Sequence, residues 1–542
     1  MFDLTGRDAG EIMAVASAHM AAPTLLSLGA ISALGATVWG VNRLSAPANR
    51  ASVQVSWRLA GAAAALFVVG FLTAGVLSVT NDTMEDGLRR KSTGNTYTRL
   101  TAALTDFDGD GYGIGGRTSD PAPFDPAIYP YALDIPGNGI DENGVGGDLP
   151  SAEPAYVEVP AAATPWPHRP NVVLIVLESF RADVVGRELN GKPVTPVLDA
   201  LAREGVASEH AFSHNGYTVQ SRYHLFTGSL AGLRQDGSIL DDFNANGYET
   251  AYFSAQDESF GGPAAGVGFE RADVSYDARQ DRDRRYSTFT TAGSLAVSHR
   301  TLQERLDAFL ASRDQSRPLF LYLNFHDTHF PYHHREIEPM VSGKSLTQRQ
   351  IRPSRQDTLF EMYLNTAANV DRAVGSALDA VARAVGAPPA VVVTADHGES
   401  LFDEGFLGHG YALNDVQTRI PLVVRGLPME IGEPFGQVDL RDAIGRALGR
   451  DDMDTPPRTV TVPGKMVFQY LGNIHRPRQI AFADGTGRTI YDFRDDRVTL
   501  AGGTPVRQHA LQGPAAEPFL NLVYYWERMM LARAAGGAPP IE

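Results

Sequence analysis

Three largely apolar segments of this chain each end in a side chain that can bind a metal ion. The segments, with the residues that follow them, are Ala390–Ala395 with Asp396 and His397, Asn171–Leu177 with Glu178, and Leu319–Phe325 with His326 and His329. Short apolar runs of this kind are typical of strands buried on both faces of a parallel sheet. Because ligands of open α/β sheets bind outside the carboxyl ends of the strands, the three endings predict one site at one sheet edge.

Strand-like and helix-like patterns alternate over residues 168–450, which we interpret as the catalytic domain. The other predicted elements are helices at Thr195–Glu204, Ser294–Ser312 and Gln356–Val385, and strands at Glu249–Ser254 and Pro421–Val424. Such alternation predicts an α/β fold, in which a mostly parallel sheet carries helices on both faces.

Residues 451–542 predict a small antiparallel C-terminal subdomain. Its expected strands are Met466–Leu471, Gln479–Ala483 and Thr489–Phe493, with a turn at Asp484–Gly487 and a closing helix at Pro514–Ala534. Alternating patterns joined by a short Gly-containing turn are typical of a hairpin. We find no chemistry in this part of the sequence.

Residues 1–80 predict two transmembrane helices. Leu59–Thr80 has 22 residues without a charge, and His19 is the only ionisable residue between Glu11 and Arg43. About 20 apolar residues are enough to cross a bilayer. The alternative is a signal peptide followed by a buried helix, but a signal peptide has a shorter apolar segment than the first one here. Three arginines in the connecting loop favour a cytoplasmic loop, but the basic cluster at 89–91 points the other way.

The linker at 81–167 contains acidic, glycine-rich loops at 105–150. The predicted calcium ligands are Asp106, Asp108, Asp110, Asp125, Asn138 and Asp141. Alternating acids let several oxygens converge on one hard cation, although Arg117 stands where an EF-hand requires a glutamate. The segment resembles the calcium-binding repeats of thrombospondin type 3 without their bracing cysteines. A calcium loop of modest affinity favours a location outside the cytosol; a solvated linker is the alternative.

Charge and composition exclude several functions. The net charge of −16 argues against nucleic acid as a partner, because phosphate binding needs a basic surface. The absence of cysteine excludes disulfides, thiolate metal sites and a cysteine nucleophile.

Thr218 is the candidate nucleophile, in the segment Gly216–Gly228. If it opens a helix, its hydroxyl lies near free N–H groups, and Arg222 follows on the same face one turn later. A metal ion would lower the pKa of the hydroxyl and produce an alkoxide. The alternative is an ordinary helix-capping threonine.

Together these segments resemble the sulfatase branch of the alkaline phosphatase superfamily over about 240 residues. The matching motifs are Arg169–Asn171 leading into Glu178, Thr218-x-x-Ser221-Arg222 with Leu225–Gly228, His326–Tyr332, Ala395–Ser400 and Gly408–Gly410. In sulfatases, the position of Thr218 holds a Cys or Ser that is oxidised to formylglycine. Threonine is instead the nucleophile of lipoteichoic acid synthases and of phosphoglycerol and phosphoethanolamine transferases, whereas Ser221-Arg222 has the sulfatase form.

The resemblance implies a role for each candidate residue. The implied metal ligands are Glu178, Thr218, Asp396 and His397, and the implied substrate-binding residues are Arg222, His326, His329 and His409. Three oxygens and one nitrogen suit a single Mn²⁺ or Zn²⁺, with Mg²⁺ as an alternative.

The sequence therefore predicts a metal-dependent phosphotransferase or phosphodiesterase that acts through a phospho-threonine on lipid headgroups or glycans. It would be an integral protein of the cytoplasmic membrane, with its catalytic domain in the periplasm or exterior. One alternative is a sulfatase-like sulfate or phosphate ester hydrolase acting on a glycan. The other is a catalytically inactive, calcium-dependent surface protein.

Overall fold

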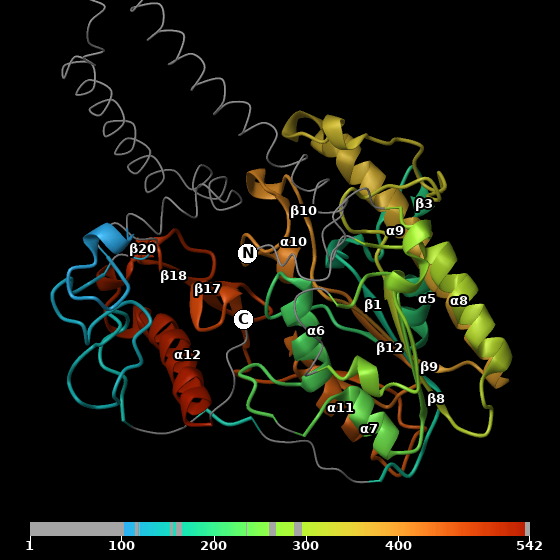
Figure 1. Ribbon diagram of the computed structural model, residues 1–542, viewed down its shortest axis with the longest axis horizontal. Coiled ribbons are helices and arrows are strands. Elements are labelled where there is room, and N and C mark those ends of the chain that lie inside the picture. Colours follow the sequence, from blue (N-terminus) through green and yellow to red (C-terminus); the bar gives the residue numbers. More distant parts are fainter. Residues whose placement is uncertain are drawn as a thin grey trace, which may run out of the picture. The chain divides into compact units, whose positions relative to one another are not determined.

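A seven-stranded sheet carries the strands that the sequence predicts to end at the site (Figure 1). In spatial order its strands are β4 (Val206–Ala207), β12 (Leu422–Arg425), β9 (Ala390–Ala395), β1 (Val172–Leu177), β8 (Leu319–Phe325), β6 (Glu249–Ser254) and β7 (Val274–Tyr276). The five strands from β9 to β7 run parallel, whereas β12 pairs with β9 and with β4 in antiparallel fashion. The predicted mostly parallel α/β sheet is confirmed.

The computed structural model describes residues 102–113, 118, 120–151, 156–158, 165–234, 236–259, 267–286 and 295–536. The chain divides into two compact units, Met1–Pro126 and Ala127–Glu542. The predicted membrane hairpin, residues 1–80, lies outside the described residues. Among the helices that are described, none combines the length and the apolarity needed to cross a membrane.

The register of the central strands aligns their carboxyl ends. Leu177 at the end of β1 pairs with Phe325 on one side and with Ala395 on the other. All residues of β1, β8 and β9 are buried, as the β-branched and aromatic content of these strands favours. The residues that follow the three strands therefore emerge side by side at one edge of the sheet.

Helices cover both faces of the sheet (Figure 1). One face carries α5 (Pro196–Glu204), α8 (His299–Ser312) and α9 (Gln356–Val385), and the other carries α6 (Thr218–Thr227), α7 (Ile239–Ala245) and α11 (Asp439–Leu448). The predicted helices are present, but α8 begins later than expected. Ala296 forms a bridge with Gln256, and Ser298 then accepts a hydrogen bond from the N–H of Thr301 and starts the helix.

Short elements complete this part of the fold. They are the strand pairs β2 (Glu188–Leu189) with β3 (Lys192–Pro193), β5 (Ala211–Phe212) with β14 (Phe435–Gly436), β10 (Ser400–Leu401) with β11 (Leu407–Gly408) and β13 (Glu430–Glu433) with β15 (Arg458–Thr461), and the helix α10 (Asp415–Thr418).

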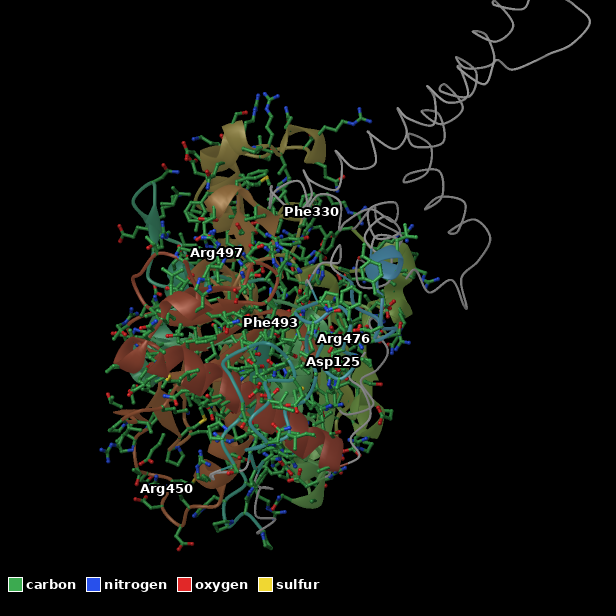
Figure 2. All side chains as sticks on the ribbon, turned by 90° about the vertical axis from the view of Figure 1, so that its left-hand side faces the viewer. Asp125, Phe330, Arg450, Arg476, Phe493 and Arg497 are labelled. Carbon is green, nitrogen blue, oxygen red and sulfur yellow. The ribbon has the colours of Figure 1, made fainter. Side chains whose placement is uncertain are left out.

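A second sheet and a long helix lie near the C-terminus. The antiparallel strands are, in order, β16 (Val467–Asn473), β17 (Arg476–Ala483), β18 (Arg488–Asp492), β19 (Arg497–Thr499) and β20 (Val506–Arg507), and the helix is α12 (Glu517–Ala535). Phe493, labelled in Figure 2, packs with its ring centroid 5.2 Å from that of the fully buried Trp526 on α12. The three predicted strands and the closing helix are confirmed, while the boundary between residues 450 and 451 stays a prediction.

Helix α5 depends on a carboxylate from α9 for its N-terminal cap. Its own N-cap, Thr195, makes no side-chain capping bond, but the buried Asp371 accepts hydrogen bonds of 2.9 Å from the N–H groups of Val197 and Leu198. We expect Asp371→Ala to lower the free energy of unfolding by about 1–3 kcal/mol, because it leaves two donors unpaired. Denaturant unfolding measures this change, with Asp379→Ala, an exposed site on the same helix, as the control.

The same substitution has a predictable pH dependence. Burial raises the pKa of Asp371 to about 6 from the model-peptide value of 3.8, so the wild type loses stability as pH rises from about 4 through 6. The variant lacks this slope, and its destabilisation is therefore larger at pH 4.5 than at pH 7.5. Equal destabilisation at both pH values would contradict a buried carboxylate at this position.

Candidate active site

Three elements bring the four predicted metal ligands to one edge of the central sheet. Glu178 follows β1, Asp396 and His397 follow β9, and Thr218 is the first residue of α6. Ligand atoms of Glu178, Asp396 and His397 all lie within 4.8 Å of one another. All four side chains are buried. The structure thus brings together residues that are up to 219 positions apart in the sequence.

The hydroxyl of Thr218 points at this cluster. Its Oγ1 donates a hydrogen bond of 2.9 Å to Oε1 of Glu178 and lies 3.2 Å from Nε2 of His397. The N-cap of α6 is Tyr217, not Thr218, and no side chain caps this helix. The capping alternative for Thr218 is therefore wrong, and its oxygen belongs to the carboxylate–imidazole cluster.

The two carboxylates carry oxygens that no hydrogen bond satisfies. Oδ1 of Asp396 accepts from the backbone N–H groups of Ser179 and His397, at 2.9 and 2.8 Å. Among the described residues, Oε2 of Glu178 and Oδ2 of Asp396 are buried and lack a hydrogen-bond partner. Burial and the charge of Asp396 raise the pKa of Glu178 well above its usual value. Crowded, unsatisfied carboxylates of this kind are typical of a cation site.

His397 is oriented to offer a lone pair to the same position. Its Nδ1 lies 2.8 Å from the carbonyl oxygen of Gly398, so Nδ1 carries the proton and donates it. Burial lowers the pKa of the ring to about 4, which keeps it neutral. Nε2 faces the carboxylates, 3.3 Å from Oδ2 of Asp396. With Thr218, the donor set of three oxygens and one nitrogen fits Mn²⁺ or Zn²⁺.

Arg222 lies one turn after Thr218 on α6 and is held on three sides. Its Nη2 is 3.5 Å from Oε2 of Glu178 and 2.6 Å from Oε1 of Gln256, and its Nη1 pairs with Glu258. Sequence reasoning missed Gln256 and Glu258. The signal was present, because both follow the carboxyl end of β6, a strand that was predicted with its observed bounds.

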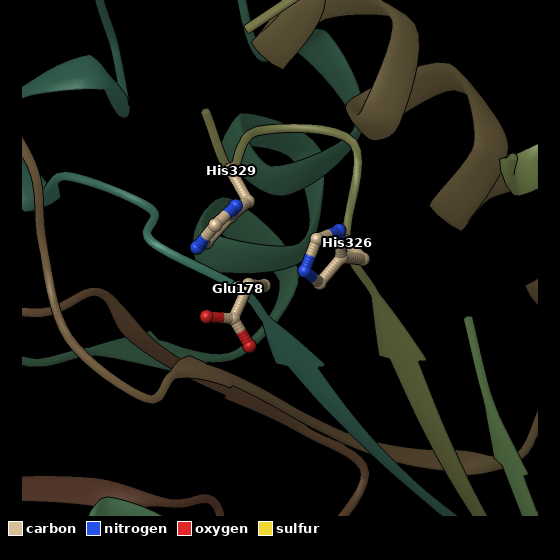
Figure 3. Close-up of side chains that lie close together, drawn as sticks. All are labelled: Glu178, His326 and His329. Carbon is tan, nitrogen blue, oxygen red and sulfur yellow. The ribbon is translucent and has the colours of Figure 1, made fainter. Parts of the chain in front are cut away.

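The predicted substrate-binding histidines line the site in a row. Ring centroids are 4.6 Å apart for His326 and His329, 5.5 Å for His329 and His409, and 4.1 Å for His409 and His397. His326 and His329 face Glu178 at the end of its strand, with ligand atoms of all three within 4.8 Å (Figure 3). The structure therefore places all three predicted histidines beside the predicted metal ligands.

His409 is oriented by Glu399, a residue that sequence reasoning did not single out. Nδ1 of His409 lies 2.6 Å from Oε2 of Glu399, whose other oxygen accepts a hydrogen bond from the hydroxyl of Tyr332. Burial alone lowers the pKa of His409, but the charge of Glu399 outweighs it and raises that pKa above its usual value. Glu399 follows Asp396-His397-Gly398 directly, so its position in the motif was the available signal.

The predicted calcium ligands fall into two sets. Asp106, Asp108 and Asp110 share one loop, with ligand atoms within 4.8 Å of one another, and Asp125 is exposed. In the second unit, Nδ2 of Asn138 donates to Glu142, and the carboxylate of Asp141 accepts from the N–H groups of Val145 and Gly147. Asn138 and Asp141 thus both serve in loop hydrogen bonds.

Solved structures that match this chain include three bacterial proteins. A lipoteichoic acid synthase, LtaP, from Listeria monocytogenes has 16% identity and a TM-score of 0.48, covering 68% of this chain and 93% of its own. The C-terminal periplasmic domain of EcEptC from Escherichia coli, in complex with Zn, has 16% identity and a TM-score of 0.42, and the match covers 59% of this chain and 94% of the EcEptC domain. A phosphonate monoester hydrolase of Agrobacterium radiobacter has 18% identity and a TM-score of 0.43, covering 68% and 96%.

A search of curated proteins found no match to the chain. The model of the sulfatase family matches residues 170–430. This range includes every residue placed above in the active site, from Glu178 to His409. Residues 170–430, just under half of the chain, therefore match the sulfatase family.

Proposed function

We propose that this protein is a metal-dependent phosphotransferase or phosphodiesterase with Thr218 as its nucleophile. The observation that carries the proposal is the position of Thr218 Oγ1, between Oε1 of Glu178 and Nε2 of His397. Glu178, Asp396, His397 and Thr218 would hold one divalent cation. When bound there, this cation would lower the pKa of the hydroxyl and offset negative charge.

The side chains around Thr218 suit a two-step displacement at phosphorus. In the first step, a bond forms between Thr218 Oγ1 and phosphorus, and the bond to the leaving alcohol breaks. Glu178 accepts a hydrogen bond from the hydroxyl and would take up its proton, and His409, whose pKa the charge of Glu399 raises, would supply a proton to the leaving oxygen. In the second step, water or an acceptor alcohol passes a proton to His409 and attacks phosphorus, and the bond to Thr218 breaks as Glu178 returns the proton to its oxygen.

Arg222 and His329 would bind the non-bridging oxygens of the phosphoryl group. The guanidinium is fixed by Gln256 and Glu258, so it is ordered before the substrate binds. A fixed cationic donor such as this guanidinium stabilises charge that develops in a transition state without further reorganisation. His326, whose Nδ1 lies 2.8 Å from the hydroxyl of Tyr286, would complete this wall of the site.

The nucleophile favours a phosphate ester over a sulfate ester. Oxidation of a threonine alcohol gives a ketone, so Thr218 cannot supply the aldehyde that sulfatases use. The Ser221-Arg222 pair keeps hydrolysis of a glycan sulfate or phosphate ester as the second candidate. An inactive surface protein is a poor explanation for an assembled set of ligands, nucleophile and histidines.

We further propose a lipid headgroup or glycan as the substrate, with the catalytic domain outside the cytoplasmic membrane. The support is the apolar sequence within residues 1–80, which would hold the domain next to lipid. A reporter enzyme active only in the periplasm, fused after residue 542, would test this location.

The substrate class is tested by incubating the full-length protein with phospholipid extract and with a glycan sulfate ester in parallel. We expect the wild type to remove a phospholipid headgroup, which mass spectrometry detects, and to release no sulfate. Glu178→Gln is the matched inactive control. Sulfate release by the wild type without turnover of any phosphodiester would contradict the proposal and favour the sulfatase-like alternative.

A further inference from the structure

The loop that begins at Asp106 uses part of its acidic groups to hold its own backbone. The carboxylates of four aspartates accept from backbone N–H groups: Asp106 from Gly109 and Gly111, Asp108 from Asp110, Asp110 from Tyr112, and Asp120 from Ala122. Gly109 and Gly111 have φ values of 86° and 94°, a conformation that favours glycine and lets the chain turn tightly here.

The remaining oxygens of these aspartates have no such role. Oδ2 atoms of Asp108, Asp110 and Asp120 are buried, and none has a hydrogen-bond partner among the residues that the structure describes. Asp120 is the most buried of these residues and is only 5% exposed. A buried carboxylate oxygen without a donor costs free energy unless a cation or a proton compensates it.

The four aspartates lie close enough for their charges to affect one another. Burial raises the pKa of Asp110, and the charges of Asp108, Asp120 and Asp106 raise it further. Burial and the charges of Asp108 and Asp106 likewise raise the pKa of Asp120. Ligand atoms of the first three aspartates already lie within 4.8 Å of one another.

We propose that Asp106, Asp108, Asp110 and Asp120 bind one calcium ion. Asp120 supplies the acid that the loop lacks at its twelfth position, Arg117. The set contains only oxygen donors, which suit a hard cation and not Zn²⁺ or Cu²⁺. An irregular loop with several carboxylates suits the larger, variable shell of Ca²⁺ better than the strict octahedron of Mg²⁺.

Asp120 was absent from the sequence-based set, and its inclusion separates this proposal from a merely acidic linker. A solvated acidic stretch would expose its carboxylates and attract cations through net charge alone. Here three carboxylate oxygens are buried, and none of them has a hydrogen-bond donor among the described residues. The site shares no residue with the proposed active site.

Titration calorimetry of the full-length protein with CaCl₂ and with MgCl₂ tests the proposal. All proteins carry Asp396→Asn, so that the active site does not contribute to the signal. We expect a calcium dissociation constant of roughly 10⁻⁴–10⁻³ M, the range for extracellular modules. Asp120→Asn should weaken it at least about tenfold, because it removes a charged ligand. Asp125→Asn, which removes the same charge from an exposed position of the same unit, should leave it within about twofold.

Hydrogen exchange gives a second measurement that is independent of calorimetry. Calcium should slow exchange of the backbone amides of Gly109, Gly111 and Tyr112, whose acceptors become fixed, and Asp120→Asn should abolish this protection. Equal calcium affinity with and without Asp120, or an equal loss in Asp125→Asn, would overturn the proposal. Neither result would bear on Thr218, whose test uses substrate turnover.

Discussion

Thr218→Ala is expected to lower kcat for a phosphodiester substrate at least about a thousandfold, with much of the metal affinity kept. The threonine oxygen is the attacking atom in the proposed mechanism, and loss of a nucleophile costs most of the catalysis that it shares with its neighbours. Glu178, Asp396 and His397 remain in the variant, so three of the four proposed ligands are unchanged. Steady-state kinetics and metal analysis by mass spectrometry measure the two quantities.

Two further substitutions separate the loss of the oxygen from the loss of the side chain. Thr218→Val keeps the shape of threonine and removes the hydroxyl, so it should be as inactive as Thr218→Ala. Thr218→Ser keeps the hydroxyl on a more mobile side chain and should retain partial activity. Because Thr218 is buried, unfolding experiments on all three variants are the control for stability.

The covalent intermediate can be observed directly. Wild type quenched during turnover should carry a phospho-group on the peptide that contains Thr218, and Thr218→Val should carry none. Full turnover by Thr218→Ala, or a labelled site elsewhere, would show that another nucleophile, such as water, attacks phosphorus.

The central strands were predictable because their chemistry is local. β6, β8, β9 and the helix α9 occur with their predicted bounds, since each is a continuous run of residues that favours one conformation. The position of ligands after a strand then follows from the general rule for parallel sheets. This is why Glu178, Asp396 and His326 could be assigned to one site before their distances were known.

Residues that act by holding other residues were harder to predict. Glu258 and Gln256, which follow β6, matter because Arg222 reaches them from helix α6. Glu399 matters because it pairs with His409, ten positions further along the chain. Asp120 likewise has no local pattern with Asp106, from which it is 14 positions away. Contacts of this kind depend on tertiary packing, which a single sequence does not specify.

Asp396→Asn is expected to lower bound metal and activity together, each at least about tenfold. The amide keeps the size of the side chain and an oxygen that can accept from the N–H groups of Ser179 and His397. It removes one of the two charges that a divalent cation would neutralise. After dialysis against Mn²⁺ or Zn²⁺, the wild type should hold one equivalent of metal in this site, and Asp379→Asn should match it.

Stability provides a readout that does not involve substrate. A cation that binds only the folded protein stabilises it by about 2.7 kcal/mol at 100 times its dissociation constant, and Asp396→Asn should lose most of this gain. Without metal, this gain should be absent from both proteins, because it comes from the bound cation alone. A variant that still gains the full stabilisation from metal would place the cation elsewhere.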